Sequence, residues 1–229
     1  MIRKNWKELD KMIGKCYESM IGVREKDNLW QDTFQLLIET ISEERKKDAD
    51  FAPELYKVGD EIDFLCDVEG WLEDYFDELD MSEKLEEIIE SANQLLELFK
   101  WEEDSKSVVN HRKASALSRT GRFQEAIVLC EEWLKKESDN PLAAASLIYS
   151  YLTEKDMDSA EKTADSFWNE ELECTFETEP YFTAAATVYG LSDNKVMLEK
   201  CKNALATFEE WFKDFYGMDG YNEDDEILF

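Results

Sequence analysis

The stretch 121–133, GRFQEAIVLCEEW, decides the fold, because its pattern returns along the chain. It begins with Gly-x-Phe-x-x-Ala, and Trp133 stands seven residues after Ala126. Thirty-four residues later, the stretch 155–167, KDMDSAEKTADSF, has the same apolar spacing, with Phe167 again seven residues after an alanine. A period of this length predicts a unit of two helices that recurs along the chain.

The composition favours helices throughout. The 229 residues contain 8 Gly and 3 Pro, whereas sheet-rich folds need frequent turns that use both residues. Apolar residues make up 43% of the chain, which excludes disorder for most of it and supplies enough material for a core. The sequence therefore predicts an all-α fold with over 65% helix, roughly double the usual share of about a third.

Apolar residues at intervals of three and four predict ten helices. In chain order they cover residues 5–22, 28–46, 60–79, 82–101, 105–119, 122–136, 141–153, 156–169, 179–191 and 194–215. A connection is expected near residues 47–60, where Pro53 follows a charged run. Helices of these lengths with short connections pack as antiparallel hairpins, and about five hairpins are expected.

A two-helix unit of 34 residues with this Gly-x-Phe-x-x-Ala pattern resembles the tetratricopeptide repeat, in a degenerate form of bacterial type. Leu117 and Tyr151 share one offset in successive units, and Asn140-Pro141 separates those units. Residues 179–212 resemble a further copy with Tyr189 at the matching position, although its spacing is 38 because the connection before it is longer.

Residues 66–101 resemble a degenerate copy, with Phe76, Leu85 and Ala92 at the repeat positions. The resemblance implies an α-helical solenoid, a superhelix of stacked hairpins. Three regions are expected: an N-terminal hairpin over 1–58 that continues the array, the repeats over 59–216, and an acidic C-terminal tail over 217–229.

The chemistry that the chain lacks is informative. His111 is the only histidine, which excludes zinc and di-iron sites built on several histidines. Five cysteines, an odd number without a Cys-x-x-Cys pair, are interpreted as buried, reduced thiols of a cytoplasmic protein. No glycine pattern is typical of a phosphate-binding loop. We therefore expect no catalytic residues, no metal and no cofactor.

The charge restricts the kind of partner. A formal net charge of −29 excludes nucleic acid as a ligand and disfavours anionic membrane surfaces. No signal peptide is visible, and the longest uncharged run, 140–153, is too short to span a bilayer. Residues 60–104 contain 18 acidic residues and two lysines. A basic protein, or one with a basic segment, is the expected partner.

In tetratricopeptide arrays the first helix of each unit lines a concave groove that binds peptides. The resemblance implies the groove-facing residues Asp74, Asp77, His111, Ser115, Arg119, Tyr149, Leu152, Thr183 and Thr187. Chaperone-binding members hold a carboxylate with Lys, Asn and Arg, but Ser115, Tyr149 and Thr183 stand there, so this clamp is not expected. Two interpretations of Arg119 stay open: it binds a ligand beside Tyr149, or it pairs with Asp74 or Asp77.

The sequence predicts a non-catalytic protein-interaction module, an adaptor or scaffold that binds a peptide or a basic protein in its groove. One alternative is an acidic inhibitor or immunity-type protein that neutralises a basic enzyme or mimics nucleic acid. A third is an enzyme on a helical scaffold. The terminal Ile227-Leu228-Phe229 follows an acidic run. It is expected either to be disordered or to dock in an apolar groove, near Leu152 and Leu191 if that groove is the protein's own.

Overall fold

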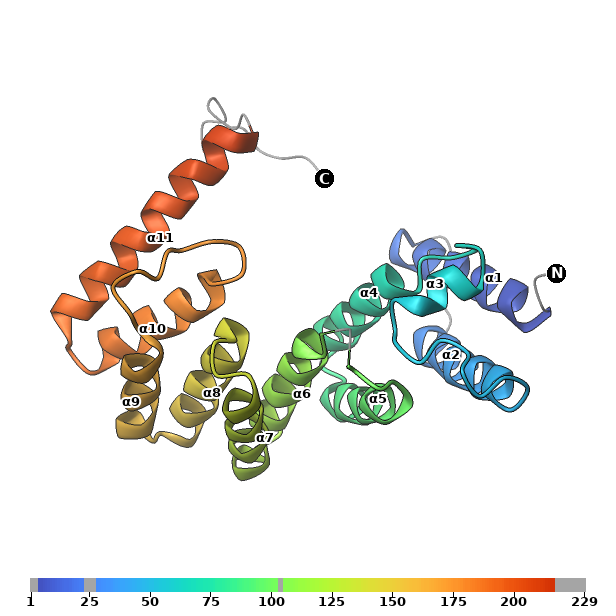
Figure 1. Ribbon diagram of the computed structural model, residues 1–229, viewed down its shortest axis with the longest axis horizontal. Coiled ribbons are helices and arrows are strands. Elements are labelled where there is room, and N and C mark those ends of the chain that lie inside the picture. Colours follow the sequence, from blue (N-terminus) through green and yellow to red (C-terminus); the bar gives the residue numbers. More distant parts are fainter. Residues whose placement is uncertain (1–3, 23–27, 103–104, 217–229) are drawn as a thin grey trace. The chain divides into compact units, whose positions relative to one another are not determined.

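The computed structural model describes residues 4–22, 28–102 and 105–216, and 75% of them are helical (Figure 1). This confirms the predicted all-α fold, and no strand occurs in the described part of the chain. The helices are α1 (Lys4–Met20), α2 (Leu29–Arg45), α3 (Lys57–Glu61), α4 (Val68–Met81), α5 (Leu85–Leu98), α6 (Ser107–Arg119), α7 (Phe123–Lys136), α8 (Pro141–Glu154), α9 (Met157–Phe167), α10 (Glu179–Leu191) and α11 (Lys195–Tyr216).

The chain forms two compact units, residues 1–116 and 117–229, and the division falls within α6. In the first unit α1 packs against α2, and α4 packs against α5. Its core is a stack of aromatic rings: Trp30 lies parallel to Trp71 at 6.0 Å, and Phe34 lies parallel to Tyr75 at 4.8 Å. Aromatic burial of this kind supplies much of the apolar area removed from water.

The prediction of one helix over residues 60–79 is wrong. The short α3 ends at Glu61, and α4 begins only at Val68. Between them Asp63 and Phe64 both have positive φ angles, 54° and 53°, which no α-helix accommodates. Asp67 then accepts a hydrogen bond from the Gly70 backbone N–H at 3.0 Å, so its side chain caps the start of α4.

One turn geometry recurs in four helix pairs. The residue that directly precedes the second helix donates its N–H to the carbonyl five residues earlier, at 2.8–3.0 Å. The residue directly before this donor has a positive φ. The donor–acceptor pairs are Lys84–Leu79, Arg122–Leu117, Asp156–Tyr151 and Asn194–Tyr189. The left-handed residues are Glu83, Gly121, Lys155 and Asp193. Leu117, Tyr151 and Tyr189 are the residues that the sequence placed at one offset.

The predicted register of the 66–101 copy is wrong. Its left-handed residue, Glu83, lies 38 residues before Gly121, which places Ile88 where the next unit has Ala126. Ala92, the residue expected there, lies one turn further along α5. Ile88 and Ala126 are both buried, so a larger side chain fills the same place between the helices.

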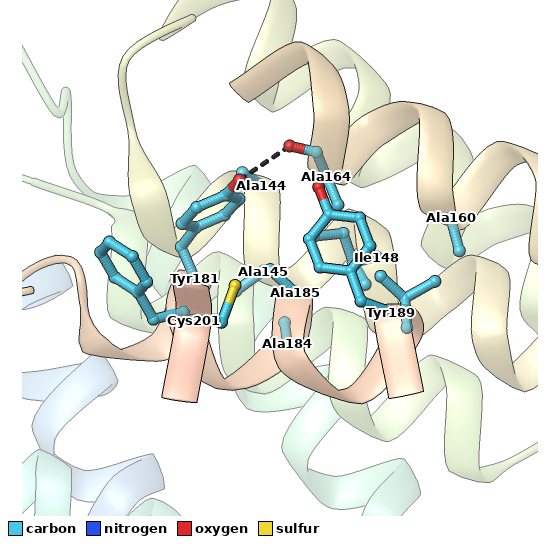
Figure 2. Packing of buried hydrophobic residues seen from close by; sticks show 12 residues of the cluster. Ala144, Ala145, Ile148, Ala160, Ala164, Tyr181, Ala184, Ala185, Tyr189 and Cys201 are labelled. Carbon is cyan, nitrogen blue, oxygen red and sulfur yellow. Dashed lines mark hydrogen bonds between the residues drawn. The ribbon is translucent and has the colours of Figure 1, made fainter. Parts of the chain in front are cut away.

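The second unit is built around small residues (Figure 2). Helix α8 packs against α7, α9 and α10, and its Ala144 and Ala145 are buried with Ala184 and Ala185 of α10. Small side chains allow helices to cross closely. Tyr181 fills the space toward α9, where its hydroxyl donates to the Ala164 carbonyl at 2.7 Å (Figure 2). The structure is therefore that of a helical-repeat-like protein.

Candidate functional site

The last helix is much longer than the helix it packs against. Helix α11 has 22 residues and α10 has 13, which correspond to lengths of about 33 Å and about 20 Å. The two helices are antiparallel neighbours joined by a short turn. The second half of α11 therefore extends past α10 and lies beside residues 168–178, the segment that joins α9 to α10 (Figure 1).

Aromatic residues line the side of α11 that meets this segment. Phe208, Trp211, Phe212 and Phe215 occupy positions i, i+3, i+4 and i+7, which lie on one helix face. The ring of Phe176 meets the first three at centroid distances of 5.1, 5.6 and 5.7 Å. Trp211 stacks on Phe215 at 5.3 Å.

These rings are packed together and yet open to solvent. Phe176 is 54% exposed, Trp211 47% and Phe215 66%. Large exposed apolar patches on soluble proteins mark sites that bind proteins, ligands or membranes. The exposed aromatic rings at the end of α11 and on the facing segment are therefore a candidate binding surface.

A cleft of about 620 Å³ opens between the two elements. Its walls are residues 172–176 on one side and Asn203, Ala204, Thr207, Phe208 and Trp211 of α11 on the other. This volume lies within the range of about 300–1,000 Å³ that is typical of ligand-binding clefts. The aromatic face continues beyond the cleft through Phe215, so the surface is extended along the helix. We call these residues together with Phe212 and Phe215 the aromatic cleft.

The wall opposite α11 is held by local hydrogen bonds. The Thr178 hydroxyl donates to the Glu173 carbonyl at 2.6 Å and accepts from the Thr175 N–H at 2.8 Å. Lys200 of α11 pairs with Glu170 at 2.8 Å, and this pairing lowers the pKa of that exposed carboxylate. The segment is therefore already shaped before any ligand binds.

Acidic side chains border the aromatic cleft. Residues 168–178 and 203–216 together contain seven acidic residues and one lysine, Lys213. Helical periodicity places Glu209 and Asp214 on the two flanks of the aromatic stripe, and Lys213, four residues after Glu209, lies further round α11 on the Glu209 side. Glu173 lies in the other wall. The apolar surface thus has a negative rim.

The residues expected in a concave groove lie in several places. His111, Ser115 and Arg119 are on α6 at intervals of four, so they share one face of that helix. His111 is half-buried, whereas Ser115 and Arg119 are exposed. Burial, and to a lesser extent the nearby Arg112 charge, lowers the pKa of His111, which favours the neutral imidazole.

Three groove residues do come together in the second unit. Burial raises the pKa of the Tyr149 phenol, and a hydrogen bond with the Thr187 side chain opposes this shift. Thr187 donates to the Thr183 carbonyl at 2.9 Å, and Thr183 donates to Glu179 at 2.6 Å. Leu152 instead packs against the buried cluster of this unit. Tyr149, Thr183 and Thr187 form a second, mainly polar surface on α8 and α10.

The two acidic groove residues are engaged within the first unit. Asp74 accepts a hydrogen bond from the Tyr17 hydroxyl at 2.8 Å, and Asp77 forms an ion pair with Arg112 of α6. The surface around them on α4 and α5 is strongly acidic, with exposed carboxylates that include Glu69, Glu73, Glu86, Glu90 and Glu97. The expected docking of Ile227-Leu228-Phe229 concerns residues outside the described part of the chain.

Two further kinds of candidate site in the described residues are metal-binding clusters and reactive thiols. Within those residues no group of three or more His, Cys, Asp or Glu side chains could hold a metal ion. All five cysteines are free thiols, and burial raises the pKa of Cys66, Cys174 and Cys201 to about 11. No helix in the described ranges is long and apolar enough to cross a membrane.

The sequence alone does not predict the aromatic cleft. The apolar spacing over residues 194–215 predicts a helix but does not show that Phe208, Trp211, Phe212 and Phe215 line an open cleft. The available signal was the combination of two features: a last helix longer than the others, and a connection before residue 180 that is four residues longer than its counterpart.

Comparisons of the chain with protein-family models, with curated proteins and with solved structures give no match. The class of the fold is therefore taken from its own geometry. Four helix pairs with one turn type define a helical-repeat-like protein. Within the described residues, the aromatic cleft is the candidate binding site, because core packing does not explain why its aromatic rings are exposed.

Proposed function

We propose that this chain is a non-catalytic protein-interaction module, an adaptor or scaffold that binds another protein through the aromatic cleft. The observation that carries this proposal is the exposed aromatic cluster formed by Trp211 and Phe215 of α11 and by Phe176 of the facing segment. Aromatic residues, and Trp and Tyr in particular, are enriched in interfaces, where truncation of a central residue often costs about 2 kcal/mol or more.

The repeats are proposed to be tetratricopeptide-like and to stack as a solenoid. The recurring turn at Leu79, Leu117, Tyr151 and Tyr189 supports this proposal, as does the packing of α8 against both α9 and α10. In such an array the face of Tyr149, Thr183 and Thr187 is a second contact surface for the same partner. The free thiols are those expected in a cytoplasmic protein, which is the proposed location.

An acidic inhibitor or immunity-type protein is the alternative, and one observation favours it. The carboxylates exposed on α4 and α5 form a dense negative surface that would attract a basic enzyme. In that case binding depends on the first unit and not on α11. The two functions are therefore separable by variants that leave the fold intact.

The test is co-purification from the organism of origin with four versions of the protein. The first is wild type, and the second carries Phe176→Ser and Trp211→Ser in the aromatic cleft. The third carries Tyr149→Ala, and the fourth carries Phe64→Ser as a control, because Phe64 is an exposed aromatic of the first unit. Circular dichroism establishes that each variant is folded.

The proposal expects a partner that is captured by wild type and by Phe64→Ser but lost with the double cleft variant. A partner retained by the cleft variant would contradict it. A fifth version carries Glu86→Gln and Glu90→Gln on α5; if the partner is retained by the cleft variant and lost with this fifth version, the inhibitor alternative replaces the adaptor.

A further inference from the structure

We propose that the aromatic cleft binds a basic amphipathic segment of its partner, with apolar side chains on one face and Lys or Arg on its margins. This inference rests on the proposed function, because it names the chemistry of the partner at the same site. It follows from three features of the described residues: the shape of the apolar surface, the charge around it, and the order of its wall.

The apolar surface suits a segment of polypeptide. Phe176 and Trp211 form the open side of the cleft, and Phe215 extends the surface by one helical turn through its stacking on Trp211. A ligand that covers all three rings must be elongated along α11. Apolar residues spaced three or four apart on a partner helix match the spacing of this stripe.

The charge around the apolar surface favours a partner that carries basic residues beside its apolar side chains. Glu209 and Asp214 flank the stripe, and Glu173 lies in the facing wall, so carboxylates border the cleft on several sides. Lys213 stands four residues after Glu209 and can offset part of the charge on that flank, but acidic residues outnumber it seven to one in residues 168–178 and 203–216. Basic residues beside the apolar anchors would form ion pairs at the edge of the interface and accelerate encounter.

The hydrogen bonds within the wall that faces α11 indicate that the cleft has one fixed shape and does not adjust to different ligands. The hydrogen bonds among Glu173, Thr175 and Thr178 hold residues 173–178 in one conformation, and the pair Lys200–Glu170 joins the start of the 168–178 segment to α11. A preformed wall lowers the entropy that binding must overcome. The partner segment is therefore recognised by fit as well as by charge.

Two other occupants are disfavoured by the same charges. The 13 residues 217–229 include five acidic residues and no Lys or Arg, so they meet like charge at the rim. A second copy of the chain brings a net charge of −29 to a partner of the same charge. Both contacts are weakened by repulsion, whereas a basic segment is attracted.

The experiment is isothermal titration calorimetry of the full chain with four synthetic peptides. The first is a helix-forming peptide of Leu and Lys, about 18 residues long, with its Leu residues on one face. The second replaces every Lys by Glu, and the third has the same composition as the first in an order without an apolar face. The fourth is the segment 217–229. Titrations are made at about 0.15 M salt, which screens long-range attraction.

The result expected is that the basic amphipathic peptide binds at least about tenfold more tightly than the other three. The variant Trp211→Ser should lose this preference, whereas the control Phe64→Ser should keep it. The inference is overturned if the first and third peptides, with and without an apolar face, bind equally tightly and if Trp211→Ser leaves both affinities unchanged. That result shows attraction to charge alone.

Further outcomes separate this inference from the proposed function. If the Glu peptide binds as tightly as the Lys peptide and Trp211→Ser weakens both, the cleft binds apolar segments without regard to charge, and only the basic partner is refuted. Preferential binding of 217–229 would make the acidic tail the occupant. Sedimentation of wild type as a dimer that Trp211→Ser dissociates would make a second copy the occupant. Each of these two results overturns the inference.

Discussion

Lys155 and Gly121 occupy equivalent positions in the recurring turn, and substitutions at these two positions are expected to have opposite effects on stability. Both have left-handed backbones, with φ angles of 68° and 80°. A side chain in this conformation costs roughly 1–2 kcal/mol, and glycine avoids this cost. We therefore expect Lys155→Gly to stabilise the second unit and Gly121→Ala to destabilise it.

The size of the effect follows from two opposing terms. Relief of strain at Lys155 contributes roughly 1–2 kcal/mol, and the extra freedom of glycine in the unfolded chain takes back about 0.4–1 kcal/mol. The net gain expected is about 0.5–1 kcal/mol. At Gly121 no described atom lies within 4 Å of an added Cβ, so backbone strain is the main cost there, and a loss of similar size is expected.

Urea unfolding followed by circular dichroism at 222 nm measures both changes, with equal m-values as the sign that the unfolded states are alike. A glycine replacement at the helical, exposed Lys162 is the control and should destabilise by about 1 kcal/mol. If Lys155→Gly destabilises the protein, or Gly121→Ala has no effect, the two residues do not share the turn geometry described here.

Three further predictions concern other parts of the chain. Asn140 accepts from the Ala143 N–H at 3.0 Å, so Asn140→Ala should lower the free energy of unfolding by about 1 kcal/mol in urea. The lowered pKa of His111 means that the unfolded chain takes up its proton first, so stability falls as pH drops below about 6.5. The variant His111→Gln should lose that part of the pH dependence in thermal melts between pH 7 and pH 5. The raised pKa values of Cys174, about 11, and Cys130, about 12, predict that thiol labelling at pH 8 is at least about tenfold slower in the native protein than in urea.

The sequence predicted the repeat where local chemistry and packing agree. The glycine, aromatic and alanine of residues 121–126 predict a left-handed turn, a helix start and a buried small residue, and the structure has the turn at Gly121, the start of α7 at Phe123 and a fully buried Ala126. The same turn in the first unit was misplaced, because Glu83 and Ile88 fill the positions of Gly121 and Ala126. Neither residue type is specific for a turn or a crossing.

The break between α3 and α4 was missed for a related reason. Asp63 and Phe64 adopt left-handed backbones that their residue types do not favour, so tertiary contacts override local preference there. The aromatic cleft could not be inferred from residues 194–215 alone. An apolar stripe predicts that a helix face is covered, but only the structure shows which partner segment covers it and how much of Trp211 and Phe215 stays exposed.

The central claim is that the chain binds a protein at the aromatic cleft on α11. Site-specific photo-crosslinking in the organism of origin tests it most directly. A benzophenone amino acid replaces Phe215 in one version, Tyr149 in a second, and the similarly exposed Phe64 in a third. The account predicts a covalent adduct with a partner protein from position 215, a weaker adduct or none from 149, and none from 64. Adducts from position 64 together with none from 215 would contradict it.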